Sequence, residues 1–335
     1  MTIHRWLQID PQESVKRLSE RLRDAVFLEL HRKGAVIAIS GGIDSSVCAA
    51  VSLKAFGKDH VYALLLPEKD SSSGSTSLGE QVCNHLDIPY GITDVTPTLE
   101  AIGCYKWRDD AIRSVFPEYD DGWKSKIVIA GNLLDSDRFN YFKLVLESPE
   151  GLRHEKRLSL KPYLEIVAAT NFKQRIRKTL EYFHADRLNY AVIGTPNRLE
   201  YDQGFFVKNG DGSADVKPIA HLYKTQVYEL GRFLGLPENI LSASPTTDTY
   251  SLEQSQDEFY FVLPYHQMDL VLFGLNHGKT PAEVAAETGL TPEQVIRVFR
   301  DIQTKRKTTF PLHRKPILLE PVPEIETRES LIDRW

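Results

Sequence analysis

The chain has 335 residues, of which 41% are hydrophobic and 26% are charged, and its formal net charge is −5. This length and composition are typical of an ordinary globular protein with one large α/β domain or two smaller ones. A slightly acidic chain gives no general electrostatic reason to bind nucleic acid or an anionic membrane. The sequence shows neither an apolar signal segment at its start nor a run of roughly 20 apolar residues that could span a bilayer. We therefore expect a cytoplasmic protein.

Cysteine usage indicates reduced thiols. The three cysteines are odd in number and form no Cys-x-x-Cys pair, which argues against a disulfide framework and against a thiolate metal site. Their positions are Cys48, Cys83 and Cys104. We interpret them as free thiols in a reducing compartment.

The N-terminal part of the chain alternates between helical and strand patterns. Apolar side chains recur at helical spacing over 12–33, and Gly34 and Gly57 stand where helices are expected to end. The predicted order is helix 12–33, strand 35–39, helix 44–56, strand 60–66 and helix 77–86. This alternation predicts an α/β fold, with a parallel sheet and helices on both of its faces.

The pattern blurs over residues 105–166, which we interpret as an insertion into the α/β core. One strand-like run covers 127–130, and a hairpin is predicted around 147–156. The remaining predicted elements are a helix over 171–184, a strand over 190–193, a Gly- and Asp-rich loop over 207–218, a helix over 223–234 and a mostly helical part over 257–307. The whole chain, 1–335, is expected to form a single domain.

A polar, glycine-rich stretch interrupts what otherwise looks like core at residues 35–51, AVIAISGGIDSSVCAAV. Glycines let a ligand approach the backbone, and the first N–H groups of the following helix have no intrahelical partner, so such a turn attracts anions. Asp44 would repel a bare phosphate, but it is useful if it holds Mg²⁺ that bridges phosphate oxygens. The candidate binding residues for a metal-bound nucleotide phosphate are Ser40, Gly41, Gly42, Asp44, Ser45 and Ser46.

Two other phosphate-binding patterns fit this chain poorly. The stretch lacks the Walker spacing and the Gly-x-Gly-x-x-Gly fingerprint. The nearest Walker-like match, at 274–280, is one residue too short and follows a predicted helix. A tight strand-to-helix turn with an Asp or Ser cap is the structural alternative, although one or two such residues would be enough for it.

Several motifs in the same order resemble those of a known family. Ser-Gly-Gly-Ile-Asp-Ser-Ser resembles the loop of the ATP pyrophosphatases, which cleave ATP to AMP and pyrophosphate. Residues 194–237, which begin GTPNRLEYDQGFFVKNGDGSADVKP, resemble the central signature of the NAD synthetase family. Shorter matches are NFKQRIR (171–177), SPTTD (244–248) and DEFYFVLPYHQMDLVL (257–272). The resemblance covers about residues 9–100 and 170–311, and it implies a Rossmann-like fold of the ATP pyrophosphatase type.

The resemblance implies a specific reaction. In this family ATP adenylates the nicotinate carboxylate of deamido-NAD, pyrophosphate leaves, and ammonia attacks the mixed anhydride to give the amide. ATP and Mg²⁺ are then the expected cofactors, deamido-NAD and ammonia the substrates, and a homodimer the expected assembly. The sequence has no counterpart of the glutaminase domain of glutamine-dependent members, so we expect free ammonia, or ammonia from a separate partner, as the nitrogen donor.

The resemblance also implies roles for individual residues. Asp44 and Glu200 would hold Mg²⁺, and Asp44, Lys224 and Asp211 would be catalytic. Contacts with ATP are implied for Ser40, Gly41, Gly42, Asp44, Ser45, Ser46, Thr195, Lys224 and Thr246. Contacts with deamido-NAD are implied for Arg175, Phe205, Lys208, Asp215, Arg306 and Lys307.

Some of these residues could instead have a purely structural role. Residues 208–215 could form only a turn, because Asn-Gly and Asp-Gly pairs favour turns. Arg175 and Arg177 could lie on a solvated helix face. Phe205 and Phe206 could belong to the core instead of packing around the pyridine ring.

The sequence departs from the family pattern at three places. Residues 67–80, PEKDSSSGSTSLGE, replace the usual Tyr-Gly-x-Gln segment, which leaves the adenine contacts unassigned. The C-terminal His-Lys-Arg appears as TKRKTTFP (304–311), without the histidine and with an ambiguous register. The insertion at 105–166 would form a lid, extend a dimer contact or change the acyl substrate.

Two alternative functions stay open at this point. One is a related amide ligase that adenylates a different carboxylate. The other is DNA binding, because residues 280–307 resemble a helix-turn-helix followed by a basic run, with Thr280 and Thr291 as helix caps and Gly289 in the turn.

Overall fold

A four-stranded parallel sheet forms the centre of the chain in the computed structural model, which describes residues 3–71, 73–130, 141–243, 250–252, 254, 260–261 and 263–322. Its strands, in sheet order, are β3 (Tyr90–Ile92), β2 (Val61–Leu65), β1 (Ala35–Ala38) and β7 (Ala191–Ile193). Val36 of β1 pairs with Tyr62 of β2 on one side and with Val192 of β7 on the other. The predicted parallel sheet is therefore confirmed.

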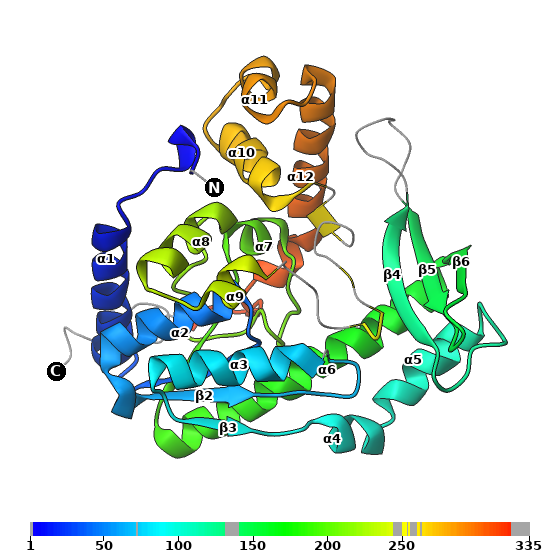
Figure 1. Cartoon of the computed structure of the whole chain (residues 1–335), viewed down its shortest axis with the longest axis horizontal. Coiled ribbons are helices and arrows are strands. Elements are labelled where there is room, and N and C mark those ends of the chain that lie inside the picture. The colour runs from blue at the N-terminus through cyan, green and yellow to red at the C-terminus, as the bar shows by residue number, and fades with distance from the viewer. Residues whose placement is uncertain are drawn as a thin grey trace.

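Helices cover both faces of this sheet (Figure 1). Successive side chains of a strand point to opposite faces, so Ile37 packs into one core and Val36 into the other. Because both faces are buried, the strands read as continuous apolar runs. On the Ile37 side lie α1 (Pro11–Asp24), α2 (Ile43–Phe56), α3 (Ser73–Leu86) and α8 (Lys224–Phe233), and on the Val36 side lie α4 (Thr96–Ala101), α5 (Cys104–Arg113) and α6 (Leu160–Leu188).

The helix predicted over 12–33 is shorter than expected. It ends as α1 at Asp24 and continues as the π-helical turn η2 (Ala25–Glu29), and the chain then turns at His31 with a φ of 52°. Gly34 does not end this helix. A Cβ atom at Gly34 would lie 2.3 Å from the His60 carbonyl oxygen, so this glycine permits a close approach at the start of β1.

A second, antiparallel sheet lies within residues 105–166. Its strands are β4 (Lys124–Ala130), β5 (Tyr141–Glu147) and β6 (Arg153–Arg157), in that order. The expected hairpin is confirmed, and the Ser148 N–H donates to the Leu152 carbonyl at 2.9 Å across its turn. Ile112, Leu144 and Ile166 join this sheet to α5 and α6 in one hydrophobic cluster.

Helix α6 starts earlier than the predicted 171–184. It begins at Leu160 and runs for 29 residues, so residues 160–166, which we placed in the insertion, form its first turns. Pro162 is tolerated there because the first N–H groups of a helix have no intrahelical partner. The helix thereby links the inserted sheet to the central one (Figure 1).

The C-terminal part is helical, as predicted. Helices α10 (Tyr265–Asn276), α11 (Pro281–Thr288) and α12 (Pro292–His313) pack around Met268, Val284 and Val295. Thr280 and Thr291 cap α11 and α12 as expected, and each accepts a hydrogen bond from a backbone N–H at 3.3 Å. The short elements are η1 (Arg5–Leu7), η3 (Lys58–His60), α7 (Arg198–Gln203) and α9 (Glu238–Ser242). No helix in the described part of the chain is both long and apolar enough to cross a membrane.

Candidate active site

The glycine-rich stretch forms a turn between β1 and α2, as predicted. Gly41 has a φ of +79°, and a Cβ atom at this position would lie 2.5 Å from the Cβ of Leu78. Gly42 is the N-cap of α2 and has no side chain to cap the first turn. The N-terminal N–H groups of α2 therefore stay available to a ligand, and the positive end of the helix dipole lies at the same point.

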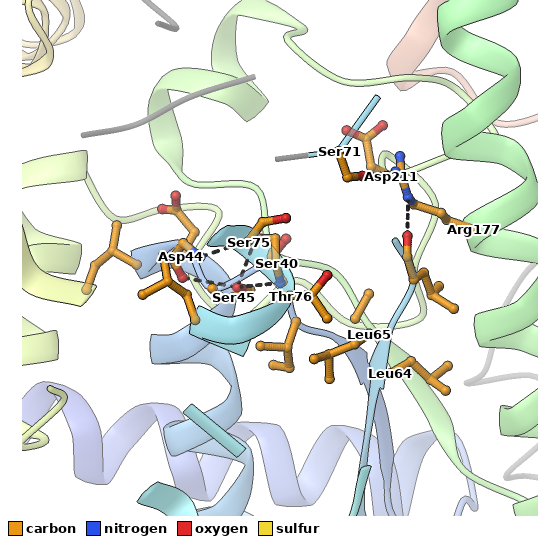
Figure 2. Close-up of a pocket in the computed structure, with 18 of the residues that line it drawn as sticks. Ser40, Asp44, Ser45, Leu64, Leu65, Ser71, Ser75, Thr76, Arg177 and Asp211 are labelled. Atoms are coloured by element: carbon orange, nitrogen blue, oxygen red, sulfur yellow. Dashed lines mark hydrogen bonds between the residues drawn. The ribbon is translucent and has the colours of Figure 1, made fainter. Parts of the chain in front are cut away.

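A cavity of about 420 Å³ opens beside this turn. Its walls are the 40–45 turn, the ends of β2 and β7, the start of α3 and one side of α6 (Figure 2). The chain leaves β1 towards β2, whereas β7 lies on the other side of β1, so the cavity lies where the strand order switches direction. Open α/β sheets bind their ligands at this point.

Three of the predicted residues meet at one end of the cavity. Lys224, the first residue of α8, forms an ion pair with the Asp44 carboxylate of α2. The Asn197 side-chain amide donates to Asp44 Oδ1 at 3.1 Å. Asn197 also caps α7, and its own N–H donates to Glu200 Oε2 at 3.0 Å. The structure thus brings Asp44, Glu200 and Lys224 together from three helices.

The neighbouring charges and burial shift the pKa values of Glu200 and Lys224. Burial, and then the nearby Asp44 carboxylate, raise the pKa of Glu200 to about 8. Burial alone would lower the pKa of Lys224, but Asp44 and Glu200 reverse this effect and raise it well above its ordinary value. A cation bound between Asp44 and Glu200 would offset the repulsion between the two carboxylates and so favour the charged form of Glu200.

The loop serines differ in their access to the cavity. Ser40 and Ser45 line it, and their hydroxyl oxygens lie 3.3 Å apart. The Ser46 hydroxyl is buried and donates to the Gly42 carbonyl at 2.8 Å, inside the first turn of α2. Ser46 therefore stabilises the turn and does not line the cavity, while Thr195 does line it. The predicted Thr246 lies outside the described residues.

Asp211 and Asp44 line the same cavity and lie at opposite sides of it (Figure 2). The Val207 N–H donates to its Oδ1 at 2.7 Å, so the Gly- and Asp-rich loop holds its own carboxylate in place. Although the Asp211 side chain keeps access to solvent, the surrounding protein raises its pKa by desolvation. This carboxylate can accept a proton closer to neutral pH than an ordinary aspartate.

Three predicted dinucleotide contacts lie on a neighbouring surface and do not line the cavity. The Arg175 Nε donates to the Lys208 carbonyl at 3.2 Å, so these two residues are adjacent. The Lys208 Nζ donates to the Pro311 carbonyl at 2.9 Å and so connects the loop to the end of α12. Asp215 accepts from the Val192 N–H at 2.7 Å and extends the sheet beyond β7.

Two of the other predicted dinucleotide contacts, Phe205 and Arg306, have structural partners. Phe205 stacks on Tyr260 with ring centroids 4.7 Å apart, and it packs against the core of the C-terminal helices. The Arg306 guanidinium donates twice to Asp202, at 2.6 and 2.7 Å. Lys307 is exposed on α12. The core alternative for Phe205 fits these contacts.

Several cavity residues lie outside the predicted site. Arg177 lines the cavity and donates from its Nε to the Leu66 carbonyl at 2.9 Å, so the solvated-face alternative is wrong for this residue. Other residues of this kind are Ser71, Ser75, Thr76, Lys178, Glu181 and Tyr228. The helical spacing of Arg177 and Glu181 places them on one side of α6, and this was the only available signal in the sequence.

An α/β fold with an anion-binding turn, a carboxylate pair and a buried lysine at its switch point defines a nucleotide-binding enzyme class. Within that class, the model of the NAD synthase family matches residues 14–115 and 139–311, and the chain belongs to this family. The family resemblance of the sequence motifs is thereby confirmed.

Relatives and solved structures agree with this assignment. The NH3-dependent NAD+ synthetase of Mesorhizobium japonicum is 54% identical over 312 residues, which cover 93% of this chain and 98% of the relative. The protein of the same name from Thermotoga maritima is 34% identical over 83% of this chain and 91% of its own length. The structure of the NH3-dependent NAD synthetase from Campylobacter jejuni aligns with a TM-score of 0.61 over 93% of this chain and 100% of that chain. At 21% identity, this last comparison supports the fold.

Proposed function

We propose that the chain is an ammonia-dependent NAD synthetase, which converts deamido-NAD, ATP and ammonia into NAD, AMP and pyrophosphate. The observation that carries the proposal is the convergence of the α2 N-terminus, Asp44, Glu200 and Lys224 on one cavity, in a chain with relatives of that name. A carboxylate is a poor acyl donor, so the reaction needs activation by ATP before ammonia can attack.

The 40–45 turn supplies the phosphate site. Its N–H groups and hydroxyls would bind the phosphates of ATP, and Lys224 would place a point charge beside them. In the first step a carboxylate oxygen of the nicotinate attacks the α-phosphorus, and the bond to the β-phosphate oxygen breaks. Donors fixed before the reaction stabilise the charge that develops on the leaving pyrophosphate.

Asp44 and Glu200 fit a Mg²⁺ ion. The described residues include no group of three or more His, Cys, Asp or Glu side chains that could hold a metal by themselves. Mg²⁺ in nucleotide sites is commonly held by one or two carboxylates together with substrate phosphates, which is the donor set that these two side chains and ATP offer. When bound, Mg²⁺ would neutralise part of the phosphate charge.

We assign Asp211 to the second step. Ammonia attacks the acyl carbon of the adenylate, the C–O bond to AMP breaks, and the nitrogen loses a proton. Asp211 would accept this proton, since its raised pKa favours proton uptake near neutral pH. The adjacent Arg175 and Lys208, with Asp215, would bind the rest of the dinucleotide outside the cavity.

Assembly and location are part of the same proposal. We infer a cytoplasmic homodimer, and exposed apolar side chains of α6 such as Leu160, Leu164 and Phe183 would suit a subunit contact. The inserted segment would extend this contact or cover the site. Light scattering coupled to size exclusion would measure the assembly.

A product assay tests the function. Purified protein with deamido-NAD, ATP, ammonium and Mg²⁺ should form NAD, AMP and pyrophosphate in equal amounts, measured by mass spectrometry. ADP as the product, or turnover of another carboxylate without NAD formation, would contradict the proposal. The α11–α12 pair uses its apolar side in the C-terminal core, and we expect no salt-dependent binding to duplex DNA.

A further inference from the structure

We propose that Lys178, held by Glu181, receives the nicotinate carboxylate of deamido-NAD and makes the site prefer this acid over the amide product. The inference rests on the proposed function and names a specificity-determining residue for it. If the inference is correct, the site binds deamido-NAD more tightly than NAD, and these two ligands differ only in the carboxylate or amide group of the pyridine ring.

Lys178 and Glu181 form a buried ion pair in the cavity wall. Their Nζ and Oε2 atoms lie 2.7 Å apart, and the two side chains are 6% and 5% exposed. Both residues belong to α6 and line the cavity. Buried charges of this kind are costly unless they are paired, and one turn of helix supplies the pair here.

Three cationic side chains line the cavity among the residues that the structure describes, and two of them have other tasks. They are Arg177, Lys178 and Lys224. Lys224 forms its ion pair with Asp44 at the phosphate turn. Arg177 donates to the Leu66 carbonyl and to the Ser71 hydroxyl, at the end of β2. Lys178 is left as the cation on the Asp211 side of the cavity.

Lys178 and Asp211 line the same cavity, and the charge of Lys178 acts on the Asp211 carboxylate. Burial raises the pKa of Asp211, and Lys178 partly opposes this effect. Burial also raises the pKa of Glu181, with Lys178 opposing and Asp211 adding to the shift. Lys178 thus favours the charged form of both carboxylates, and it would favour the carboxylate of an acidic ligand in the same way.

A lysine at this position distinguishes the acid from the amide. The nicotinate carboxylate can accept a charge-assisted hydrogen bond from the Lys178 ammonium, whereas the neutral amide of NAD can accept only a weaker one. The Lys178 ammonium is charged in both complexes, so the two bonds differ in the charge of the acceptor, and we expect this to give about a tenfold difference in affinity. The substrate is thus held before the reaction, and the product is released after it.

A binding experiment on a double variant that lacks both charges tests the inference. Lys178→Met with Glu181→Gln removes both charges at similar volume and leaves no buried ion without a partner. Calorimetric titration with deamido-NAD and with NAD, each with Mg²⁺ and a non-hydrolysable ATP analogue, gives the two affinities. We expect the parent protein to bind deamido-NAD at least about tenfold more tightly than NAD. The double variant should lose about tenfold or more in affinity for deamido-NAD and keep its affinity for NAD.

Matched variants separate this role from a structural one. Arg232→Met with Glu229→Gln removes an ion pair of the same spacing and distance on α8, and it should leave the preference unchanged. Lys178→Arg should retain most of the preference, and the KM for ATP should stay constant in every variant. An equal loss of affinity for both dinucleotides, or no loss for either, would overturn the inference. A parent protein that forms no NAD would instead refute the proposed function.

Discussion

Single side chains set the charge balance at the phosphate end of the cavity. Asp44 and Glu200 face it from different helices, and Lys224 lies close to both. Among the residues that the structure describes, neither carboxylate belongs to a group of three or more side chains that could hold a metal, so we expect each to act together with ATP phosphates.

Asp44→Asn should abolish adenylation and preserve the fold. Asparagine keeps the volume and can still accept a hydrogen bond from Lys224, but it cannot supply the negative charge for Mg²⁺. We expect kcat to fall by at least about 10²-fold, with an unchanged circular dichroism spectrum. Normal turnover in Asp44→Asn would show that this residue holds no metal.

Lys224→Ala should lower kcat and raise the KM for ATP together.

The raised pKa of Glu200 predicts a dependence of stability on pH. The folded chain keeps a proton on this side chain between its ordinary value of 4.5 and about 8, where the unfolded chain releases it. Stability therefore falls as the pH rises through this window. Urea midpoints measured with EDTA at pH 5.5 and pH 8 should show the decrease, and Glu200→Gln should reduce it. A variant with the same pH dependence as the parent would contradict this origin.

At the scale of elements, the turn between β1 and α2 requires glycine at one position in particular. Gly41→Ala adds a Cβ atom 2.5 Å from Leu78 at a φ of +79°, so both backbone strain and a clash oppose it. We expect a loss of about 1–3 kcal/mol in the free energy of unfolding, together with a higher KM for ATP. Gly57→Ala is the control, because its φ is +78° but nothing lies within 4 Å. It should cost about 1–3 kcal/mol through backbone strain alone and leave the KM for ATP unchanged.

Local sequence signals predicted the elements that repeat a simple pattern. Strand β1, helix α2 and the capped pair α11 and α12 follow from apolar runs, glycine ends and threonine caps. The start of α6 could not be predicted in this way. Its first turns carry a proline and mixed aromatic residues, and contacts with the inserted sheet stabilise them. Tertiary packing, which local propensity does not record, decides such a boundary.

The residues of the site could likewise be predicted from the sequence only in part. The loop residues and the triad of Asp44, Glu200 and Lys224 could be predicted because ordered motifs carry them. The inward direction of Arg177 and Lys178 could not, since charged residues on a helix usually face water. Only the position of α6 across the cavity makes these charges part of the site.

At the scale of the whole molecule, a buried ion network joins the antiparallel sheet, through α5 and α6, to the central parallel sheet. Lys173 of α6 donates to Glu68 at 3.0 Å and to Asp70 at 2.5 Å, just beyond β2. Arg108 of α5 forms a further ion pair with Asp70. Burial would raise the pKa of Asp70, but Lys173 and Arg108 reverse this and hold it below its ordinary value. The network therefore fixes α5 and α6 relative to the central sheet.

Lys173→Met should consequently destabilise the whole molecule. The change leaves the buried carboxylates of Glu68 and Asp70 without their shared cation. Among the described residues, Arg108, the more distant Arg177 and Lys69 remain to compensate. Removal of one partner from a buried ion pair costs about 3–5 kcal/mol, so the urea midpoint should fall clearly. Lys58→Met removes an exposed pair with Asp87 and should leave the midpoint unchanged. If both variants unfold at the parent midpoint, the network does not hold the antiparallel sheet to the central one. If Lys173→Met alone is destabilised, the charges beyond β2 connect the two sheets into one cooperative structure.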